Sequence, residues 1–435
     1  MHSKILIIGT SPYDRQGPAR AFESYFKNWE KENLMQIFSS PKKPNVGHCS
    51  QLYQITDQML LKRWFSSKVK TGKLYKIEEL IEEEKTNNII NNKQSKIINK
   101  LYMFGSKKFP LNYLLRGILW KKSFWCTDEL IELVDNFKPE CIFLAFSDDY
   151  FIPKMALYFA ERYKIPIVSC IGDDYYFNER FSMSPFYWLY RITYKKLIRK
   201  IFLHGGSAAY IGDKIRDKYN KEFSLNGKTV YLTSEIKPHE FRLINSEQPK
   251  ITYCGNIRLG RNHSLNDIGK ALGKLNSEYK LDIYSNEKDK KYFTELQNNP
   301  NINFHGAVSY SKVMKVMKDS DILIVVEGFS KEDVRITRYS LSTKVADSLS
   351  TGGAVLAYGS IECGAIEYLK NIKCVSVCTE KSKLEKIIFE MINNKEEQKR
   401  NYYMALEIVK KHHILERSTA TFEEIIIDAI QSYKK

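Results

Sequence analysis

The sequence predicts an α/β protein made of two tandem Rossmann-like, doubly wound domains that face each other across a cleft. Its 435 residues exceed the roughly 250–300 residues at which a single hydrophobic core stops growing. Short apolar runs alternate with helical stretches in two separate blocks, which favours two mostly parallel sheets. Between the blocks, residues 233–250 are polar, contain two prolines and show little apolar periodicity, as a linker does. We therefore expect an N-terminal domain over residues 1–240, a C-terminal domain over 241–410 and a final helix, 411–435, that crosses back to the first domain.

The first block begins with an apolar run, residues 4–9, that ends in a glycine. A buried strand followed by a loop and a helical pattern, here residues 19–29, is typical of the doubly wound fold. A further helix is expected at residues 153–163. Four more short apolar runs are expected to be strands: 141–146, 167–171, 201–204 and 229–232.

The second block repeats this alternation after the linker. Its expected strands are residues 251–254, 281–284, 302–305, 322–326 and 354–358. Its expected helices are residues 264–276, 288–297 and 309–317, and a long helical pattern over 383–433 closes the chain. Because open α/β sheets bind ligands at the carboxyl ends of their strands, the loops after these strands are the expected place for a site.

The stretch from residue 339 to 358 combines polar groups suited to an anion with a buried strand. Ser342 and Thr343 can cap a helix, and Lys344 falls in its first turn. A helix amino terminus with a lysine suits phosphate. Asp347 follows on the same helix face and can accept hydrogen bonds from ribose hydroxyls. Gly352 then ends the helix before the strand at 354–358.

A second polar loop follows the strand at 251–254. It begins with Gly255 and Asn256 and offers two guanidinium groups, those of Arg258 and Arg261. Guanidinium groups are strong, permanently charged donors to phosphate oxygens. With Lys344, this loop predicts a diphosphate site. Loop arginines that are merely solvated, and an ordinary intrahelical ion pair between Lys344 and Asp347, are the alternatives.

The charge of the chain is uneven. Of the formal net charge of +17, +12 lies in residues 1–125, which hold 22 Lys and Arg against 10 Asp and Glu, so an anionic partner is expected there. Residues 85–127 hold nine basic residues, no acidic one and several aromatics, a mixture that favours an anionic membrane surface. A solvated basic face over core aromatics is the alternative. No nucleic-acid-binding module is recognisable, so nucleic acid is not expected as a partner.

The eight cysteines are scattered and show no zinc-ligand spacing, which indicates buried thiols in a reducing compartment. No apolar run approaches the ~18 residues that a membrane span needs, and the first apolar run is too short for a secretory signal. We expect a cytoplasmic protein that is at most peripheral on the inner face of a membrane.

These motifs resemble those of the retaining glycosyltransferases of the GT-B fold, specifically the large family 4 and its bacterial surface-polysaccharide members. The loop with Gly255 and Arg261 looks like the first donor-phosphate loop of that family. Residues 344–355 look like its carboxylate helix, with Asp347 where a glutamate usually meets the ribose and Gly352 at the turn. The resemblance covers most of the second domain and extends more weakly into the first.

The family commonly carries two glutamates separated by seven residues, whereas Tyr339 stands at the corresponding first position here. Glu327 resembles that first glutamate in its local sequence but lies twenty residues before Asp347. Residues 331–338 would then be an inserted loop that brings Arg335 and Arg338 towards the donor.

In the first domain, the loop of residues 9–20, with Gly17, resembles the glycine-rich loop that lies against the donor phosphates in the family. Asp173 and Asp174 occupy the place where many members have a histidine-aspartate pair near the reacting carbon, so Asp173 or Asp174 is the candidate for contacting substrate hydroxyls. Paired aspartates of this kind are also common at turns and helix starts.

The resemblance implies transfer of a sugar from a nucleotide diphosphate sugar to an acceptor hydroxyl with retention, in cell-envelope or capsular polysaccharide synthesis. Arg261, Lys344 and Asp173 would take the catalytic roles. The acceptor would be a glycan or a lipid-linked group, and neither a metal nor a further cofactor would be needed, since cationic side chains stabilise the leaving diphosphate. A nucleotide-sugar epimerase of similar fold and an inactive binding partner are the alternatives.

Overall fold

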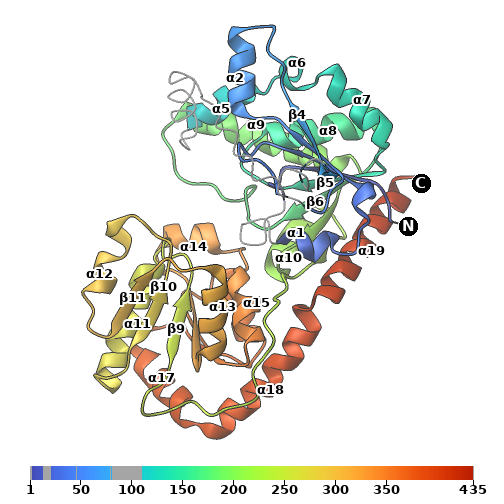
Figure 1. The fold of residues 1–435 in the computed structure, drawn as a ribbon. Coiled ribbons are helices and arrows are strands. Elements are labelled where there is room, and N and C mark those ends of the chain that lie inside the picture. The colour runs from blue at the N-terminus through green and yellow to red at the C-terminus, as the bar shows by residue number, and fades with distance from the viewer. Residues whose placement is uncertain (1, 13–20, 46, 79, 81–109, 435) are drawn as a thin grey trace. The chain divides into compact units, whose positions relative to one another are not determined.

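The computed structural model describes residues 2–12, 21–45, 47–78, 80 and 110–434, which form two compact units (Figure 1). Unit 1 comprises Met1–Val230 and Thr419–Lys435, and unit 2 comprises Tyr231–Ser418. Each unit has its own sheet and its own hydrophobic core. The predicted α/β class, with two Rossmann-like domains, is confirmed.

Unit 1 is built on an eight-stranded sheet with the order β4-β3-β2-β1-β5-β6-β7-β8. Among the strands that the structure describes here, only β3 and β4 pair in antiparallel fashion. The central strand β1 reads Ile-Leu-Ile-Ile with all four residues buried, as expected for a parallel strand covered on both faces. The strands are β1 (Ile5–Ile8), β2 (Leu34–Phe38), β3 (Gln51–Gln54), β4 (Lys73–Lys76), β5 (Cys141–Ala145), β6 (Ile167–Ile171), β7 (Ser207–Tyr210) and β8 (Lys228–Thr229).

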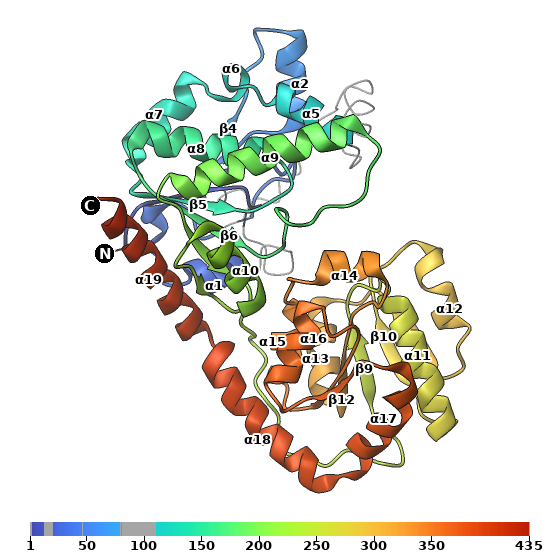
Figure 2. The ribbon, with the colours of Figure 1, turned by 180° about the vertical axis from the view of Figure 1, so that it is seen from behind.

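Helices of unit 1 cover both faces of this sheet (Figures 1 and 2). The described helices are α1 (Ala21–Phe26), α2 (Asp57–Phe65), α5 (Pro110–Leu119), α6 (Lys122–Trp125), α7 (Asp128–Phe137), α8 (Phe151–Tyr163), α9 (Pro185–Leu203) and α10 (Asp213–Phe223), with a short 3-10 turn at Lys31–Asn33. The C-terminal helix α19 (Leu415–Tyr433) places Phe422, Ile425 and Ile426 in the same core as β1 and β5, so the end of the chain completes unit 1.

Unit 2 is built on a six-stranded parallel sheet with the order β11-β10-β9-β12-β13-β14. Counted within the unit, this is the 3-2-1-4-5-6 order of the dinucleotide-binding fold. The strands are β9 (Ile251–Cys254), β10 (Leu281–Tyr284), β11 (Ile302–Gly306), β12 (Ile322–Val326), β13 (Ala354–Tyr358) and β14 (Ser376–Cys378). The helices are α11 (Arg261–Leu275), α12 (Thr294–Gln297), α13 (Tyr310–Asp319), α14 (Lys331–Thr337), α15 (Thr343–Ser350), α16 (Gly364–Asn371), α17 (Leu384–Asn393) and α18 (Lys395–His412), with 3-10 turns at Lys290–Tyr292 and Lys381–Lys383.

The strand order fixes where each unit can hold a ligand. In unit 2, β10 and β11 lie on one side of β9, whereas β12, β13 and β14 lie on the other. In unit 1, the strand order changes direction in the same way between β1 and β5. Loops diverge at such a reversal and leave a crevice at the carboxyl ends of the two strands. The residues after β9 and β12 are therefore the first place to look in unit 2.

Several expected elements differ in the structure. The strand expected at 229–232 is the two-residue β8, and the helix expected at 288–297 is a 3-10 turn followed by the four-residue α12. Residues 201–204 are not a strand, because Ile201 and Phe202 continue the buried face of α9, which ends where Gly205 takes a φ of 71°. The strand of that region is β7. Residues 331–338 are not an inserted loop but α14, whose start is capped by Ser330 accepting a hydrogen bond from the Asp333 amide. The long pattern over residues 383–433 is divided into three helices by Asn394 and His413. The predicted glycine-rich loop with Gly17 and residues 85–109 of the basic segment lie outside the described residues, apart from Gly9 to Pro12.

Candidate functional site

Two charged side chains meet at the carboxyl ends of β9 and β12 in unit 2. Arg261 is the first residue of α11, and Glu327 directly follows β12. The Arg261 guanidinium binds the Glu327 carboxylate through Nε and Nη2, at 3.1 and 2.8 Å from Oε2, and Nη2 also lies 3.0 Å from Oε1. Glu327 is 3% exposed. Burial raises the pKa of this carboxyl group, and the guanidinium opposes that shift.

Lys344 enters the same place from the start of α15. Ser342 caps this helix by accepting a hydrogen bond from the Lys344 amide. The Lys344 ammonium donates to the Tyr253 hydroxyl at 2.8 Å and lies 4.7 Å from the centre of that ring. The buried Tyr253 hydroxyl in turn donates to the Asn256 carbonyl. A strand tyrosine therefore holds the ammonium beside the loop that follows β9.

The electrostatics of this cluster favour an anion. Burial and the neighbouring Arg261 guanidinium lower the pKa of Lys344 to about 7, although the Glu327 carboxylate acts in the opposite direction. Arg261 and Lys344 thus share the Glu327 carboxylate at a site that is largely removed from solvent. Desolvation and like charge both disfavour the protonated lysine until a negative group arrives. We call Arg261, Glu327 and Lys344 the anion-site cluster.

Gly255 leaves the space that the lysine occupies. Its φ of +143° disfavours other residues, and a Cβ at this position would lie 2.0 Å from Lys344 Cε. The glycine therefore allows the lysine side chain to lie directly against the backbone after β9. No residue with a side chain fits here unless Lys344 moves.

Asp347 lies one turn further along α15 and is buried. Its Oδ1 accepts a hydrogen bond from the Ser234 hydroxyl at 2.8 Å. Lys344 and Asp347 both influence the Cys254 thiol, which places them on the same side of the end of β9. Burial raises the pKa of Cys254 to about 12, so this thiol is no nucleophile at neutral pH. Thr343 is exposed in the first turn of the helix.

Three predicted arginines are directed elsewhere. Arg258 is about half exposed and forms an ion pair with Glu287, whose Oε1 lies 2.9 Å from Nη2. Arg338 pairs with Glu362 at the surface. Arg335 pairs with Glu332 of the same helix. The structure thus brings Gly255, Asn256, Arg261, Glu327 and Lys344 together and leaves Arg258 and Arg338 outside the cluster.

In unit 1, the two aspartates after β6 have different environments. Asp173 is exposed. Asp174 is buried, and its Oδ1 accepts hydrogen bonds from the amides of Tyr176 and Phe177 and from the Tyr219 hydroxyl. Asp174 therefore holds the chain after β6, whereas the Asp173 side chain lies at the surface.

The pair Asp148-Asp149, after β5, was not among the predicted site residues, yet it lies where the strand order of unit 1 reverses. The Tyr113 hydroxyl donates to Asp148 at 2.7 Å. Arg116 bridges Asp149 to Asp57, whose Oδ2 lies 3.1 Å from Arg116 Nε. Two adjacent aspartates shortly after a buried strand are the available signal, and α5 supplies the partners that the sequence could not place.

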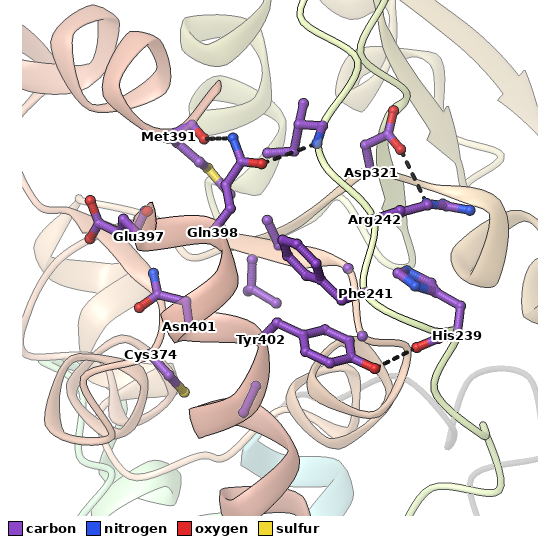
Figure 3. A pocket seen from close by; sticks show the side chains of 17 residues that line it. His239, Phe241, Arg242, Asp321, Cys374, Met391, Glu397, Gln398, Asn401 and Tyr402 are labelled. Carbon is purple, nitrogen blue, oxygen red and sulfur yellow. Dashed lines mark hydrogen bonds and ion pairs between the residues drawn. The ribbon is translucent and has the colours of Figure 1, made fainter. Parts of the chain in front are cut away.

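A pocket lies at the opposite end of the strands of unit 2, at the amino ends of β12 and β13 (Figure 3). Much of its polar lining is already paired. Gln398 donates to the carbonyls of Met391 and Ile392, and the Tyr402 hydroxyl donates to the His239 carbonyl at 2.8 Å. This pocket is separate from the anion-site cluster, which lies at the carboxyl ends of the strands.

No helix in the described part of the chain has the length and apolar character to cross a membrane. Over the same residues, no three His, Cys, Asp or Glu side chains gather as a metal-binding group.

Comparisons with known proteins identify the fold. No protein-family model matches the sequence, and no curated protein sequence matches it. WaaG, a glycosyltransferase involved in lipopolysaccharide biosynthesis, superposes with a TM-score of 0.53 and 11% identity over 98% of this chain and 99% of that chain. HepE from Anabaena, in complex with UDP and glucose, gives 0.58 and 10% over 98% and 100%. An α,α-trehalose-phosphate synthase (UDP-forming) from Burkholderia vietnamiensis gives 0.56 and 9% over 99% and 100%. At these identities the likeness shows the fold, and the chain has the GT-B fold that the sequence predicted.

Proposed function

We propose that this protein is a glycosyltransferase that moves a sugar from a nucleotide diphosphate sugar to an acceptor hydroxyl, with retention at the anomeric carbon. One observation carries the proposal: where the strand order of unit 2 reverses, the cations of Arg261 and Lys344 meet around the buried carboxylate of Glu327. A diphosphate supplies the negative charge that this lysine needs. The solved structures of similar fold support a nucleotide sugar as the ligand, since HepE was seen with UDP and with UDP-glucose.

The cluster is suited to a leaving diphosphate. As the bond between the anomeric carbon and the phosphate oxygen breaks, negative charge grows on the diphosphate, and cations held ready nearby stabilise it. Glu327 binds Arg261 through Nε and Nη2. Among the described residues, Arg261 Nη1 makes no hydrogen bond. The two N–H groups of Nη1 therefore donate to the diphosphate. Lys344 supplies the second cation. Glu327 is thus a positioning residue that fixes the arginine rather than a base.

The remaining donor contacts come from α15 and from the loop after β9. The first-turn amides of α15, with Ser342 and Thr343, favour phosphate at the helix start. Asp347 accepts hydrogen bonds from ribose hydroxyls, a role that requires it to exchange or share its bond from Ser234.

The anomeric configuration is retained if the acceptor hydroxyl attacks the anomeric carbon on the same face from which the diphosphate leaves. A donor phosphate oxygen then takes the acceptor proton, so the reaction needs neither a strong protein base nor a metal ion. Asp173, exposed after β6, contacts substrate hydroxyls in this scheme. The acceptor is a glycan or a lipid-linked group of the cell envelope or capsule, met at the inner face of the membrane.

The test is to incubate the full chain, in EDTA, with a panel of nucleotide diphosphate sugars and to follow nucleoside diphosphate release and the anomer of the released or transferred sugar by proton NMR. The account predicts turnover with the donor's anomeric configuration preserved. Arg261→Ala and Lys344→Ala should each lower kcat by about 100-fold or more. Arg258→Ala is the matched control and should keep most activity, because its side chain pairs with Glu287.

Three results would count against the proposal. An inverted product would refute the same-face route. Conversion of the sugar without an acceptor would indicate a nucleotide-sugar epimerase instead. Nucleotide-sugar binding without any turnover, over a broad range of acceptors, would indicate a binding protein.

A further inference from the structure

Unit 1 exposes an unusual share of the large apolar side chains. Of the nineteen such side chains that are exposed in the described part of the chain, eleven belong to three segments: residues 57–70, 110–125 and 180–200. These segments contain α2, α5, α6, most of α9 and the turn before it. We call the surface that they form the apolar-basic face.

The turn before α9 is the most exposed part of this face. Phe181 and Met183 are each 90% exposed, which is rare for side chains of this kind. The turn is nevertheless held in place, because Trp188 Nε1 donates to the Ser182 carbonyl at 2.8 Å. Its apolar side chains are therefore presented by a fixed backbone.

One exposed side of helix α9 is apolar near the start of the helix and basic near its end. Leu189 and Ile192, three residues apart, are both more than half exposed. Lys196 and Lys200 follow at four-residue intervals on the same side and are exposed as well. The opposite side of the helix is buried and carries Tyr190, Tyr194 and Ile198. The exposed side is thus apolar in its first half and basic in its second.

Helix α5 continues the apolar surface. Its exposed Leu111, Leu115 and Ile118 recur at the spacing of one helix face. Its other side faces inward, where Tyr113 stacks on Tyr190 of α9 with ring centres 4.7 Å apart.

The same inward side of α5 binds α2, because Arg116 Nε lies 3.1 Å from Asp57 Oδ2. Figures 1 and 2 both show α2, α5 and α9 gathered on one side of unit 1. The exposed Trp64 and Phe65, at the end of α2, extend the face.

The charge of these three segments is almost all of one sign. They hold 13 Lys and Arg and a single acidic residue, Asp57. Asp57 is already bound to Arg116 and to Trp120 Nε1, at 2.7 Å. Lys121 stands over the Trp64 and Phe124 rings, at 5.2 and 4.1 Å from their centres. Cations therefore border the exposed aromatic side chains.

We propose that the apolar-basic face is a docking surface for an anionic phospholipid bilayer. Aromatic and aliphatic side chains bordered by Lys and Arg match the boundary between acyl chains and anionic headgroups. A second copy of the chain fits less well, because a symmetric contact through this face would bring the same cations together. The surface predicted from the sequence, residues 85–127, included α5 but neither α9 nor α2. The inference does not depend on the proposed activity.

The test uses the full chain and two kinds of vesicle, one of phosphatidylcholine alone and one with 30% phosphatidylglycerol, in a cosedimentation assay. Wild type should bind the anionic vesicles and release them in 0.5 M NaCl. Leu189→Glu with Ile192→Glu should lower the partition coefficient at least tenfold, since each side chain loses its apolar burial. Lys196→Glu with Lys200→Glu should lower it by a similar factor, because each basic residue contributes to anionic-surface binding.

Phe389→Glu is the matched control, because Phe389 is 57% exposed on α17 of unit 2, outside the face. It should bind vesicles like wild type. All variants change exposed residues, so their melting temperatures should stay close to that of wild type, which shows that they fold.

Equal binding of the α9 variants and wild type would overturn the proposal, as would no preference of wild type for anionic vesicles. A concentration-dependent dimer that the Leu189→Glu, Ile192→Glu variant abolishes, without vesicle binding, would assign the face to a second copy and overturn it too.

Discussion

The depressed pKa of Lys344 makes the affinity for a nucleotide sugar depend on pH in a defined direction. The diphosphate binds the protonated ammonium, and in the free protein that form declines above a pKa of about 7. A bound diphosphate raises the pKa again by opposite charge. The affinity should therefore be nearly constant below pH 6.5 and fall as the pH rises, reaching about 25-fold weaker binding at pH 8.5 than at pH 6.5 when the bound pKa lies well above 8.5.

The stability of the free protein should change in the opposite direction. The pKa of Lys344 is lower in the folded state, about 7, than in the unfolded state, 10.5. Between these values the unfolded chain binds more protons, so the lysine makes the free energy of unfolding rise with pH, by up to about 1.4 kcal/mol per pH unit. Comparison with Lys344→Met isolates this contribution from the other titrating groups.

The assay is calorimetric titration with UDP-glucose, or with the best nucleotide sugar found, between pH 6.5 and 8.5, where the diphosphate diester keeps its charge. Lys344→Met should bind weakly at every pH and show no such slope. Lys344→Arg keeps a permanent charge and should also lose the slope. Wild-type affinity that does not vary with pH, or an unchanged slope in Lys344→Met, would refute the reasoning.

Three further predictions concern the anion-site cluster and the residues beside it. Gly255→Ala should weaken nucleotide-sugar binding at least tenfold in calorimetry, because its Cβ would displace Lys344 and its φ of +143° is strained for alanine. Glu327→Gln should lower the free energy of unfolding by about 3 kcal/mol or more in urea titrations, since Arg261 would lose its buried partner; a loss below 1 kcal/mol would contradict the assigned role. Asp347→Asn should leave the melting temperature nearly unchanged and weaken binding about tenfold, if the carboxylate accepts from ribose; undiminished affinity would exclude that contact.

Much of the second domain could be predicted from the sequence because most of its strands are short apolar runs. The strands at 251–254, 281–284, 322–326 and 354–358 occur with the expected bounds. The runs at 322–326 and 354–358 are apolar throughout and lie in a parallel sheet covered on both faces, so the apolar run and the strand coincide. The helix cap at Ser342 and the place of Lys344 in the first turn could also be predicted, because a serine before a helix caps its free amide groups.

Residues that act across the fold were harder to predict. Tyr253 acts through its hydrogen bond with Lys344, ninety-one positions later. The sequence around a strand tyrosine does not predict such a partner. Arg258 and Arg261 are alike in sequence, and only the folded chain shows that Glu287 binds the former and Glu327 the latter. The error at 201–204 has a local cause, because an apolar run that ends a long helix has the same composition as a short strand.

We infer that Lys344 and Arg261 hold the diphosphate of a nucleotide sugar. The most direct test of this inference is thermal unfolding of the wild type and of Lys344→Ala with a panel of nucleotide diphosphate sugars. We expect at least one of them to raise the melting temperature of the wild type by several degrees at a saturating concentration, and Lys344→Ala to lose most of this shift. Stabilisation of both proteins to the same extent, or of neither by any member of the panel, would contradict it.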